Sequence, residues 1–258
     1  MAIDMIRMLR GMIGELRWAP ANRRVRASVD GYTVADSRDV RVVWEPRRPV
    51  AQYAVPVSDL AGDLVDPMPV TGDETQPAVL PPRVPFRVHS TPGTSWSLRL
   101  PTGAVLDEAA FTPADPDLAD WVILDWHAFD EWTEEDQVVY AHPHDPFHRI
   151  DCLTSTRHVV VRLGDTVLAD TRRPVLLQET NLQNRWYIPR DDVRMELLAP
   201  SDTSTACAYK GTASYWSAEL DDLTVEDAAW SYDDPLHDGV PIGGMLCFYD
   251  DRVTVEVD

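Results

Sequence analysis

A thiol and an ammonium group lie three residues apart in the stretch 201–216, which reads S-D-T-S-T-A-C-A-Y-K-G-T-A-S-Y-W. An ammonium close to Cys207 would favour the thiolate, which is the nucleophilic form, and Lys210 would supply that ammonium. Gly211 permits a positive φ or a close approach of another segment. The spacing predicts a reactive or anion-binding corner. The alternative is a small buried cysteine beside a lysine that is paired with an acid such as Glu179.

Acidic and aromatic residues of the same half of the chain complete the predicted site. Glu179 ends the apolar run P-V-L-L-Q-E, where it could orient Lys210 or act as a base. The candidate catalytic residues are therefore Cys207, Lys210 and Glu179. The candidate ligand-binding residues are those that could wall a pocket or add a second cation: Tyr187, Arg194, Tyr209, Gly211, Tyr215 and Trp216. The alternative for the aromatic residues is an ordinary core.

Metal and nucleotide signatures are missing from the sequence. It contains no C-x-x-C, no H-E-x-x-H, no Walker loop, no G-x-S-x-G and no G-x-G-x-x-G after a strand. Three histidines lie in H-P-H-D-P-F-H, residues 142–148, but two prolines stiffen this segment, and a solvated connector is preferred over a metal site. We therefore predict no metal and no cofactor.

The charge balance limits the partners. The 258 residues carry 43 acidic and 23 basic side chains, for a net charge of −20. Such a chain is repelled by nucleic acid and by anionic lipid, so neither is a predicted partner. Three separated cysteines argue against a disulfide framework and suit a reducing compartment. No apolar run is long enough to cross a membrane and no secretory signal is present, which predicts a cytoplasmic protein.

The elements that must position the site are mostly short strands. Alternating apolar residues and turn residues, such as Asp30-Gly31, predict hairpins along the whole chain. Helical spacing occurs at residues 2–17, where an amphipathic helix is expected to pack on the body, with membrane contact as the alternative. Helices are also expected at residues 131–140 and 190–198, a strand at residues 86–89, and a long loop at residues 61–85.

One order of elements occurs twice. At a shift of 134, L-A-D-T at residues 168–171 matches V-A-D-S at residues 34–37, Glu179 matches Glu45, and Tyr187 matches Tyr53. At a shift of 119, Ile242 matches Ile123. The sequence therefore predicts a tandem duplication of a mainly antiparallel β domain. The predicted boundaries are a helix at 1–20, a first domain at 21–141, a linker at 142–156 and a second domain at 157–258.

The stretch 201–216, together with E-D-A-A-W-S-Y-D-D-P and I-G-G-M-L-C-F-Y-D-D-R-V-T-V, resembles the bacterial domain of unknown function 427. The resemblance implies two tandem β-tent domains and brings a nucleotidyltransferase label. The family motif C-P-[FYW]-K-G stands here as Cys207-Ala208-Tyr209-Lys210-Gly211, without its proline. The first copy has H-S-T-P-G at residues 89–93 instead, so it would serve as scaffold, lid or dimer surface.

Two functions follow from these observations. The leading hypothesis is a small-molecule site in the second domain, with catalysis left open. The alternative is a non-catalytic binding or assembly module whose acidic surface meets a protein partner. Homo-oligomer formation is left open.

Overall fold

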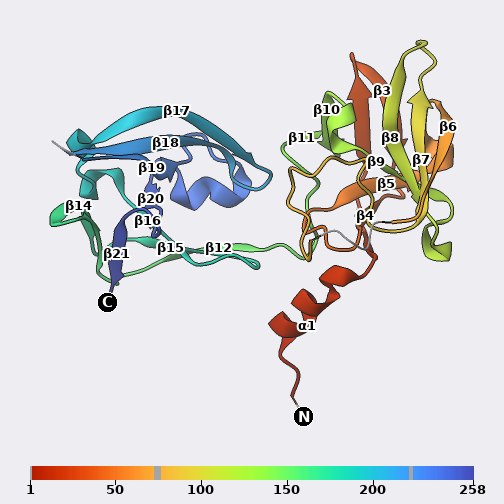
Figure 1. Cartoon of the computed structure of the whole chain (residues 1–258). Coiled ribbons are helices and arrows are strands. Elements are labelled where there is room, and N and C mark those ends of the chain that lie inside the picture. Colours follow the sequence, from red (N-terminus) through yellow and green to blue (C-terminus); the bar gives the residue numbers. More distant parts are fainter. Residues whose placement is uncertain (1, 73–76, 221–222) are drawn as a thin grey trace. The chain divides into compact units, whose positions relative to one another are not determined.

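The computed structural model describes residues 2–72, 77–220 and 223–258, and it divides the chain into unit 1, residues 1–146, and unit 2, residues 147–258. Both units consist of antiparallel sheets, and the one α-helix of the described residues is short and N-terminal (Figure 1). The predicted mainly β fold is thus confirmed. None of the described helices combines the length and the apolar character that crossing a membrane requires.

Unit 1 contains two sheets with a core between them. The seven strands of the larger sheet are, in spatial order, β1 (Arg17–Pro20), β4 (Arg41–Trp44), β5 (Gln52–Pro56), β9 (Trp121–Leu124), β8 (Val105–Pro113), β7 (Gly93–Arg99) and β6 (Asp63–Val70). The four strands of the smaller sheet are β11 (Gln137–Val139), β10 (Glu131–Glu134), β2 (Val25–Val29) and β3 (Tyr32–Ser37). Asp30 and Gly31 have φ values of 50° and 74°, as the predicted tight hairpin turn requires.

Unit 2 has the same plan with one strand fewer. Its larger sheet consists of β12 (Ile150–Thr154), β15 (Val175–Glu179), β16 (Arg185–Ile188), β20 (Leu246–Phe248), β19 (Leu223–Ser231), β18 (Gly211–Leu220) and β17 (Leu198–Cys207). Its smaller sheet consists of β14 (Thr166–Thr171), β13 (Val159–Leu163) and β21 (Thr254–Val257). Strand β12 lies inside the range 142–156 for which the sequence predicts a linker.

The remaining elements are 3-10 turns and one helix. The turns are η1 (Met12–Gly14), η2 (Val57–Asp59), η3 (Pro116–Leu118), η4 (Trp126–Ala128), η5 (Arg190–Asp192), η6 (Met195–Leu197) and η7 (His237–Ile242). Turn η7 matters for the site, because its Ile242 packs in an apolar cluster on the outer face of the larger sheet of unit 2.

Four local predictions are wrong. Residues 131–140 form the hairpin β10–β11 instead of a helix, since Glu135 turns the chain with φ 50° and Trp132 and Glu134 alternate inward. Residues 190–198 form two 3-10 turns, because Val193 between them bridges to Ala169. Residues 86–89 form no strand, and β6 occupies part of the predicted loop 61–85.

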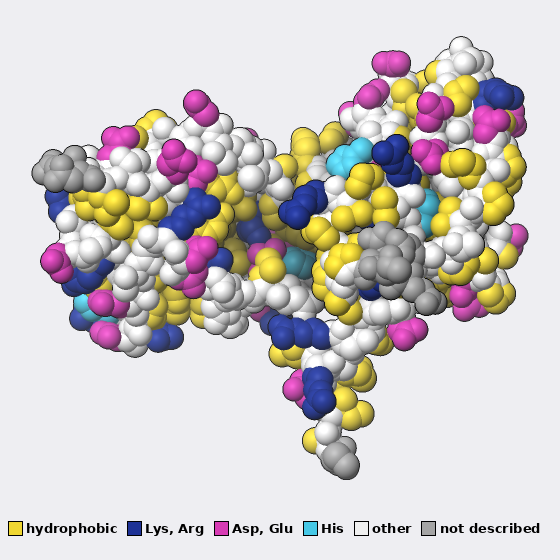
Figure 2. Space-filling view, viewed as in Figure 1, with side chains coloured by type: hydrophobic (Ala, Val, Ile, Leu, Met, Phe, Trp, Pro, Cys, Tyr) yellow, Lys and Arg dark blue, Asp and Glu magenta, His cyan; other side chains and the backbone are white. Residues whose placement is uncertain are grey.

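The N-terminal segment differs from its prediction in length and packing. The helix α1 (Met5–Gly11) begins at an Asp4 cap, where the Arg7 amide donates to Oδ1 at 3.1 Å, and it buries no residue. Its apolar side chains are open to solvent beside its arginines (Figure 2), and Met5 is 56% exposed. Leu16, beyond the helix, packs against an apolar cluster of unit 1. The helix does not pack on the body.

The two units share strand order and irregularities. The strands of the two larger sheets correspond when each sheet is read in spatial order. In that order, the strands β1, β4, β5, β9, β8, β7 and β6 of unit 1 match β12, β15, β16, β20, β19, β18 and β17 of unit 2. Trp96 and Trp216 each precede a bulge, and their Nε1 atoms donate to Thr112 Oγ1 at 2.9 Å and to Ser231 Oγ at 3.1 Å. These matches establish which positions of the two units correspond.

The match of Trp96 with Trp216 fixes the register of the two larger sheets. The strand pairings then give the partner of every other position, and these partners can be compared with the predicted residue matches. Glu45 and Glu179 take the same place at the end of β4 and β15. Tyr53, however, corresponds to Trp186, because Tyr187 takes the place of Ala54. Ile123 corresponds to Cys247 and not to Ile242. Ile123 pairs with Phe111 of β8, and Cys247 pairs with Trp230, the residue of β19 that matches Phe111.

Candidate functional site

A buried ion pair occupies the corner that the sequence singles out. Lys210 lies in the turn between β17 and β18, and its Nζ donates to Glu179 Oε2 at 2.5 Å. The other carboxylate oxygen of Glu179 is 3.0 Å from Nε2 of His148. The side chains of Lys210 and Glu179 are 8% and 9% exposed. The structure therefore joins two of the three candidate catalytic residues.

The pair connects opposite sides of one sheet. Glu179 ends β15, the second strand from one edge of the larger sheet, whereas Lys210 follows β17, the strand at the other edge. The hydrogen bond between Lys210 and Glu179 therefore spans the outer face of the larger sheet. An apolar cluster that includes Ile242 of η7 lies on this face.

The backbone of the turn is fixed from two sides. Cys207 pairs with Gly211 across the hairpin, and Gly211 has φ +94°, a conformation that favours glycine. The Leu236 amide donates to the Lys210 carbonyl at 3.0 Å. A Cβ at Gly239 would lie 3.3 Å from Lys210 Cα, so η7 approaches the turn closely because this residue is glycine. The position of Lys210 thus depends on two glycines, Gly211 at the start of β18 and Gly239 in η7.

The electrostatics of the pair favour its ionised form. Burial by itself would raise the pKa of Glu179, but the hydrogen bond from His148 and the charge and hydrogen bond of Lys210 outweigh burial and hold that pKa below its ordinary value. Burial raises the pKa of the neighbouring Cys152 thiol, and the Lys210 charge opposes this rise. Glu179 is therefore a firmly ionised carboxylate and a weak base.

An aromatic ring covers the histidine of the site. Tyr209, next to Lys210 in the turn, stacks on His148 with ring centroids 4.2 Å apart and an interplanar angle of 18°. The histidine that the sequence assigns to a connector thus contacts Glu179, and the structure places Tyr209 on it.

The wall beside the pair is aromatic and carries hydroxyl groups. Tyr187 is buried and accepts from Trp230 Nε1 at 2.9 Å. The Tyr215 hydroxyl is 2.9 Å from Thr205 Oγ1 and 3.4 Å from the Tyr249 hydroxyl. Burial raises the pKa of Tyr187, so its phenol stays protonated. Cys207 lies at the border of this cluster, which also contains Tyr232.

Two predicted ligand-binding residues lie elsewhere. Because side chains alternate along a strand, Trp216 points to the opposite face from Tyr215 and packs against the core between the two sheets. Arg194 is exposed and donates to Glu196 at 2.9 Å. The structure brings neither of them to the Lys210–Glu179 pair.

The composition contains a signal that motif reasoning overlooks. Lys210 is the single lysine of the sequence, so the other 22 of the 23 basic side chains are arginines. Most basic positions of the chain are exposed or half-buried, whereas this lysine is buried. A buried lysine in a chain that otherwise uses arginine marks a position where a compact ammonium is needed.

The linker histidines bind separate carboxylates. His144 Nδ1 is 2.7 Å from Glu134 Oε2 in unit 1, and His148 bonds to Glu179 in unit 2. Glu134 also accepts from Arg23 at 2.7 Å and from the Tyr53 hydroxyl. Within residues 2–72, 77–220 and 223–258, no three histidine, cysteine or acidic side chains are grouped so as to hold a metal ion.

Unit 1 has a glutamate, Glu45, at the position that corresponds to Glu179, but it has no lysine. Oε1 of Glu45 is 3.1 Å from His89 Nδ1, and Oε2 accepts from the Ser90 amide at 2.9 Å. His89 and Ser90 come shortly before β7, as Lys210 comes directly before β18. In both units a glutamate at the end of a strand thus bonds to the connection between the two strands of the outer hairpin. The donor is an ammonium group only in unit 2.

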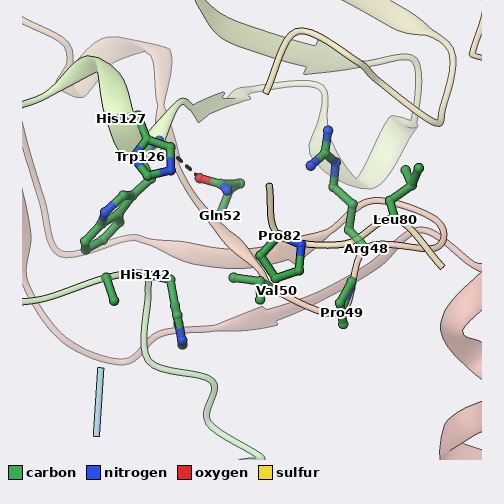
Figure 3. A pocket seen from close by; sticks show the side chains of 10 residues that line it. Arg48, Pro49, Val50, Gln52, Leu80, Pro82, Trp126, His127 and His142 are labelled. Atoms are coloured by element: carbon green, nitrogen blue, oxygen red, sulfur yellow. Dashed lines mark hydrogen bonds between the residues drawn. The ribbon is translucent and has the colours of Figure 1, made fainter. Parts of the chain in front are cut away.

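A cavity of ≈ 70 Å³ lies in unit 1 and is lined in part by Arg48, whose Nε is 3.8 Å from Glu45 Oε1 (Figure 3). Trp126 and His127 of η4 border it on one side, and Val50 and Pro82 on another. The Trp126 amide donates to Gln52 Oε1 at 3.2 Å at its rim. None of the predicted site residues lines this cavity.

Comparison with protein families agrees with the division of the chain. Residues 151–258 match the family model NTP_transf_9, described as a domain of unknown function (DUF427). The match falls within unit 2 and contains Glu179, Cys207 and Lys210, whereas His148 precedes it. No curated protein matches the chain.

Proposed function

We propose that the DUF427 domain of this protein binds a small molecule that presents a carbonyl oxygen to Lys210. Glu179 and His148 hold the ammonium in place, and Tyr209 and the aromatic wall contact the body of the ligand. The proposal concerns the corner formed by the turn between β17 and β18 and the end of β15.

The observation that carries the proposal is the unused donor capacity of Lys210. An ammonium has three N–H donors. Among the described residues Nζ has one hydrogen-bond acceptor, Glu179 Oε2, although the side chain is 8% exposed. Because buried polar groups are generally hydrogen-bonded, two donors in such a place call for a further acceptor.

The charge around Lys210 decides which kind of hydrogen-bond acceptor on a ligand is favoured. Lys210 and Glu179 form a pair without net charge, and the whole chain has a net charge of −20. A phosphate group would meet little attraction there, while a neutral carbonyl oxygen can accept a charge-assisted hydrogen bond without an added charge.

Binding is better supported than catalysis. Both oxygens of Glu179 are engaged and its pKa is lowered, which makes it a poor proton acceptor. Glu179 therefore orients Lys210. Cys207 has a place at the border of the aromatic wall, where it would contact the ligand.

The nucleotidyltransferase style of the family label does not fit the donor set. Nucleotidyl transfer commonly uses Mg²⁺ held by carboxylates. Among the described residues no three histidine, cysteine or acidic side chains are grouped so as to hold a metal ion.

The test is a thermal-shift screen of neutral carbonyl compounds, such as amides, lactams, esters and aldehydes, against the full chain. A compound that raises the melting temperature is then titrated calorimetrically against Lys210→Met. We expect at least a tenfold loss of affinity in Lys210→Met and no loss in Arg194→Met, which removes an exposed cation. Equal affinity of the wild type and Lys210→Met would disprove the proposal.

We also propose that unit 1 arose as a copy of the same domain. The matching strand order, the matching bulges and the paired positions of Glu45 and Glu179 support this. In this copy the carboxylate holds the loop before β7, and no ammonium is present to bind a ligand. A sequence profile built from close relatives of unit 1 should then match unit 2; failure to do so would argue against duplication.

A further inference from the structure

We propose a second binding site in unit 2: the outer edge of β21 and the cavity beside it take up an extended segment of a partner protein that carries an aromatic residue next to a basic residue. The site is separate from the Lys210 corner, and the proposal does not depend on the function proposed above.

The smaller sheet of unit 2 ends in an unpaired strand. In unit 1, β10 is paired with β2 on one side and with β11 on the other. Its counterpart in unit 2, β21, is paired with β13, and no other strand of the described residues pairs with it. The free amides and carbonyls of such an edge are a template for one more antiparallel strand.

A cavity lies directly beside this edge. It has a volume of ≈ 150 Å³ and is lined by residues of both sheets, among them Val255 and Val257 of β21, Trp186 of β16 and Phe248 of β20. Val255 and Val257 are only half-buried. An apolar side chain that entered here would extend the core between the sheets.

Unit 1 shows what fills the corresponding space. Trp132 pairs with Ala27, and Val255 pairs with Val161 at the matching place, so Val255 stands where unit 1 has a tryptophan. Trp132 is buried and stacks on Trp126 with centroids 5.2 Å apart. The cavity of unit 2 is thus the space of an aromatic ring that this unit does not supply.

Unit 1 also shows how a strand reaches this space. Val139 of β11 lies opposite Trp132 and is 6% exposed, within the core. A segment added to β21 in the manner of β11 would place one side chain opposite Val255. Because Val255 is smaller than Trp132, that side chain can be an aromatic ring where unit 1 has valine.

The charges around the edge favour a basic flank. Asp250, Glu256 and Asp258 are 56%, 58% and 84% exposed. Asp251 is also exposed.

Two arginines compensate part of this acidity. Arg185 pairs with Asp250 at 2.9 Å and Arg162 with Glu256 at 3.5 Å. Arg252 is directed to the backbone oxygens of Glu226 and Asp227. Arg157 Nε donates to the Asp258 backbone oxygen at 2.5 Å, and His158 Nδ1 is 3.6 Å from Asp258 Oδ2. Four carboxylates thus face three arginines, two of them ion-paired, and a partner segment with arginine or lysine would be attracted.

The test uses the full chain and a fluorescent probe peptide with the sequence Arg-Thr-Val-Trp-Val-Thr-Arg. Anisotropy titration should show saturable binding. Replacing the tryptophan of the peptide by serine, or N-methylating its alternate amides, should each weaken binding at least tenfold. The first change tests the cavity and the second tests strand pairing.

A protein variant supplies the matched control. Val255→Trp places in β21 the ring that unit 1 has at Trp132, and it should fill the cavity and abolish peptide binding. Val240→Trp adds the same ring at an exposed position of η7 and should leave binding unchanged. Circular dichroism melting checks that both variants fold.

Three results would overturn the proposal. They are unchanged binding by Val255→Trp, equal binding of the N-methylated peptide, and absence of binding by any form of the peptide. Analytical ultracentrifugation of the chain alone could give a fourth contradicting result. This would be a dimer that dissociates in Val255→Trp and persists in Val240→Trp. Such a dimer would mean that a second copy of the chain pairs with the edge of β21.

Discussion

Glu45 and Glu179 occupy matching positions at the ends of β4 and β15, and each accepts hydrogen bonds on both carboxylate oxygens from outside its own strand. In each unit one of these donors lies in the connection of the outer hairpin of the sheet, shortly before its second strand, β7 or β18. The two carboxylates therefore close their sheets in the same way, and the kind of donor distinguishes the units.

Removing the ammonium should destabilise unit 2. Lys210→Met leaves Glu179 buried beside a thioether, and breaking a buried ion pair in this way costs about 3–5 kcal/mol. Hydrogen exchange of β15, β17 and β18, followed by mass spectrometry, should show faster exchange in unit 2 and unchanged exchange in unit 1.

The double variant Lys210→Met/Glu179→Gln is the control for charge. It removes both charges, so we expect it to recover part of the loss, as a coupled pair should. If Lys210→Met alone exchanged like the wild type, the ion pair would not contribute to the closure of the sheet.

Stability should fall in acid because of two buried glutamates. Burial opposes ionisation of Glu134 and Glu179, but hydrogen bonds from His144, Tyr53 and Arg23 to the first, and from His148 and Lys210 to the second, hold both pKa values below 4.5. A lowered folded pKa contributes stability that is present above the unfolded value near 4.5 and is lost as the pH falls through the folded value.

This pH dependence can be assigned by substitution. Melting temperature measured from pH 7 to pH 3 should drop below about pH 4.5 in the wild type. Glu179→Gln should start lower and show a shallower drop, since one of the two groups no longer titrates. A Glu179→Gln profile parallel to that of the wild type would contradict the assignment.

The single lysine should resist amine reagents while the protein is folded. Its side chain is 8% exposed and Nζ donates to Glu179. Reductive methylation followed by mass spectrometry should modify the α-amino group first and Lys210 much more slowly, and the difference should vanish in urea. Equal rates at the two amines in the folded chain would contradict the buried position of Lys210.

Much of the strand pattern could be predicted from the sequence, because alternation and turn residues are local signals. The turn at Asp30-Gly31, for example, has the predicted conformation. Acidic residues misled the helix prediction at residues 131–140, where burial of Trp132 and Glu134 by the core decides in favour of a strand.

The site was predictable in part. Pairing of Lys210 with Glu179 followed from their types and from the apolar run before Glu179. The prediction for Trp216 is wrong because neighbouring side chains of a strand point to opposite faces of the sheet. Tyr215 lies on the face of the site, so Trp216 lies on the other face. His148 was overlooked because the bond that brings it to Glu179 depends on where β12 joins the sheet.

Thiol chemistry offers a readout of the Lys210 charge that does not need a ligand. Burial raises the pKa of Cys247 to about 12, so this thiol should react only when the protein unfolds. Burial also raises the pKa of Cys152, but the charge of Lys210 counteracts part of that rise. Removing the charge should therefore raise the pKa of Cys152 further, lower its thiolate fraction and slow its alkylation severalfold.

Iodoacetamide labelling at pH 8, with peptide mass spectrometry to separate the three cysteines, tests this directly. Lys210→Met should slow Cys152 and leave Cys247 unreactive, whereas Arg194→Met, which removes a cation far from the corner, should change neither rate. Faster labelling of Cys152 in Lys210→Met would mean that the substitution opens the sheet. In that case exposure, and not the charge of the ammonium, would govern the reactivity of Cys152.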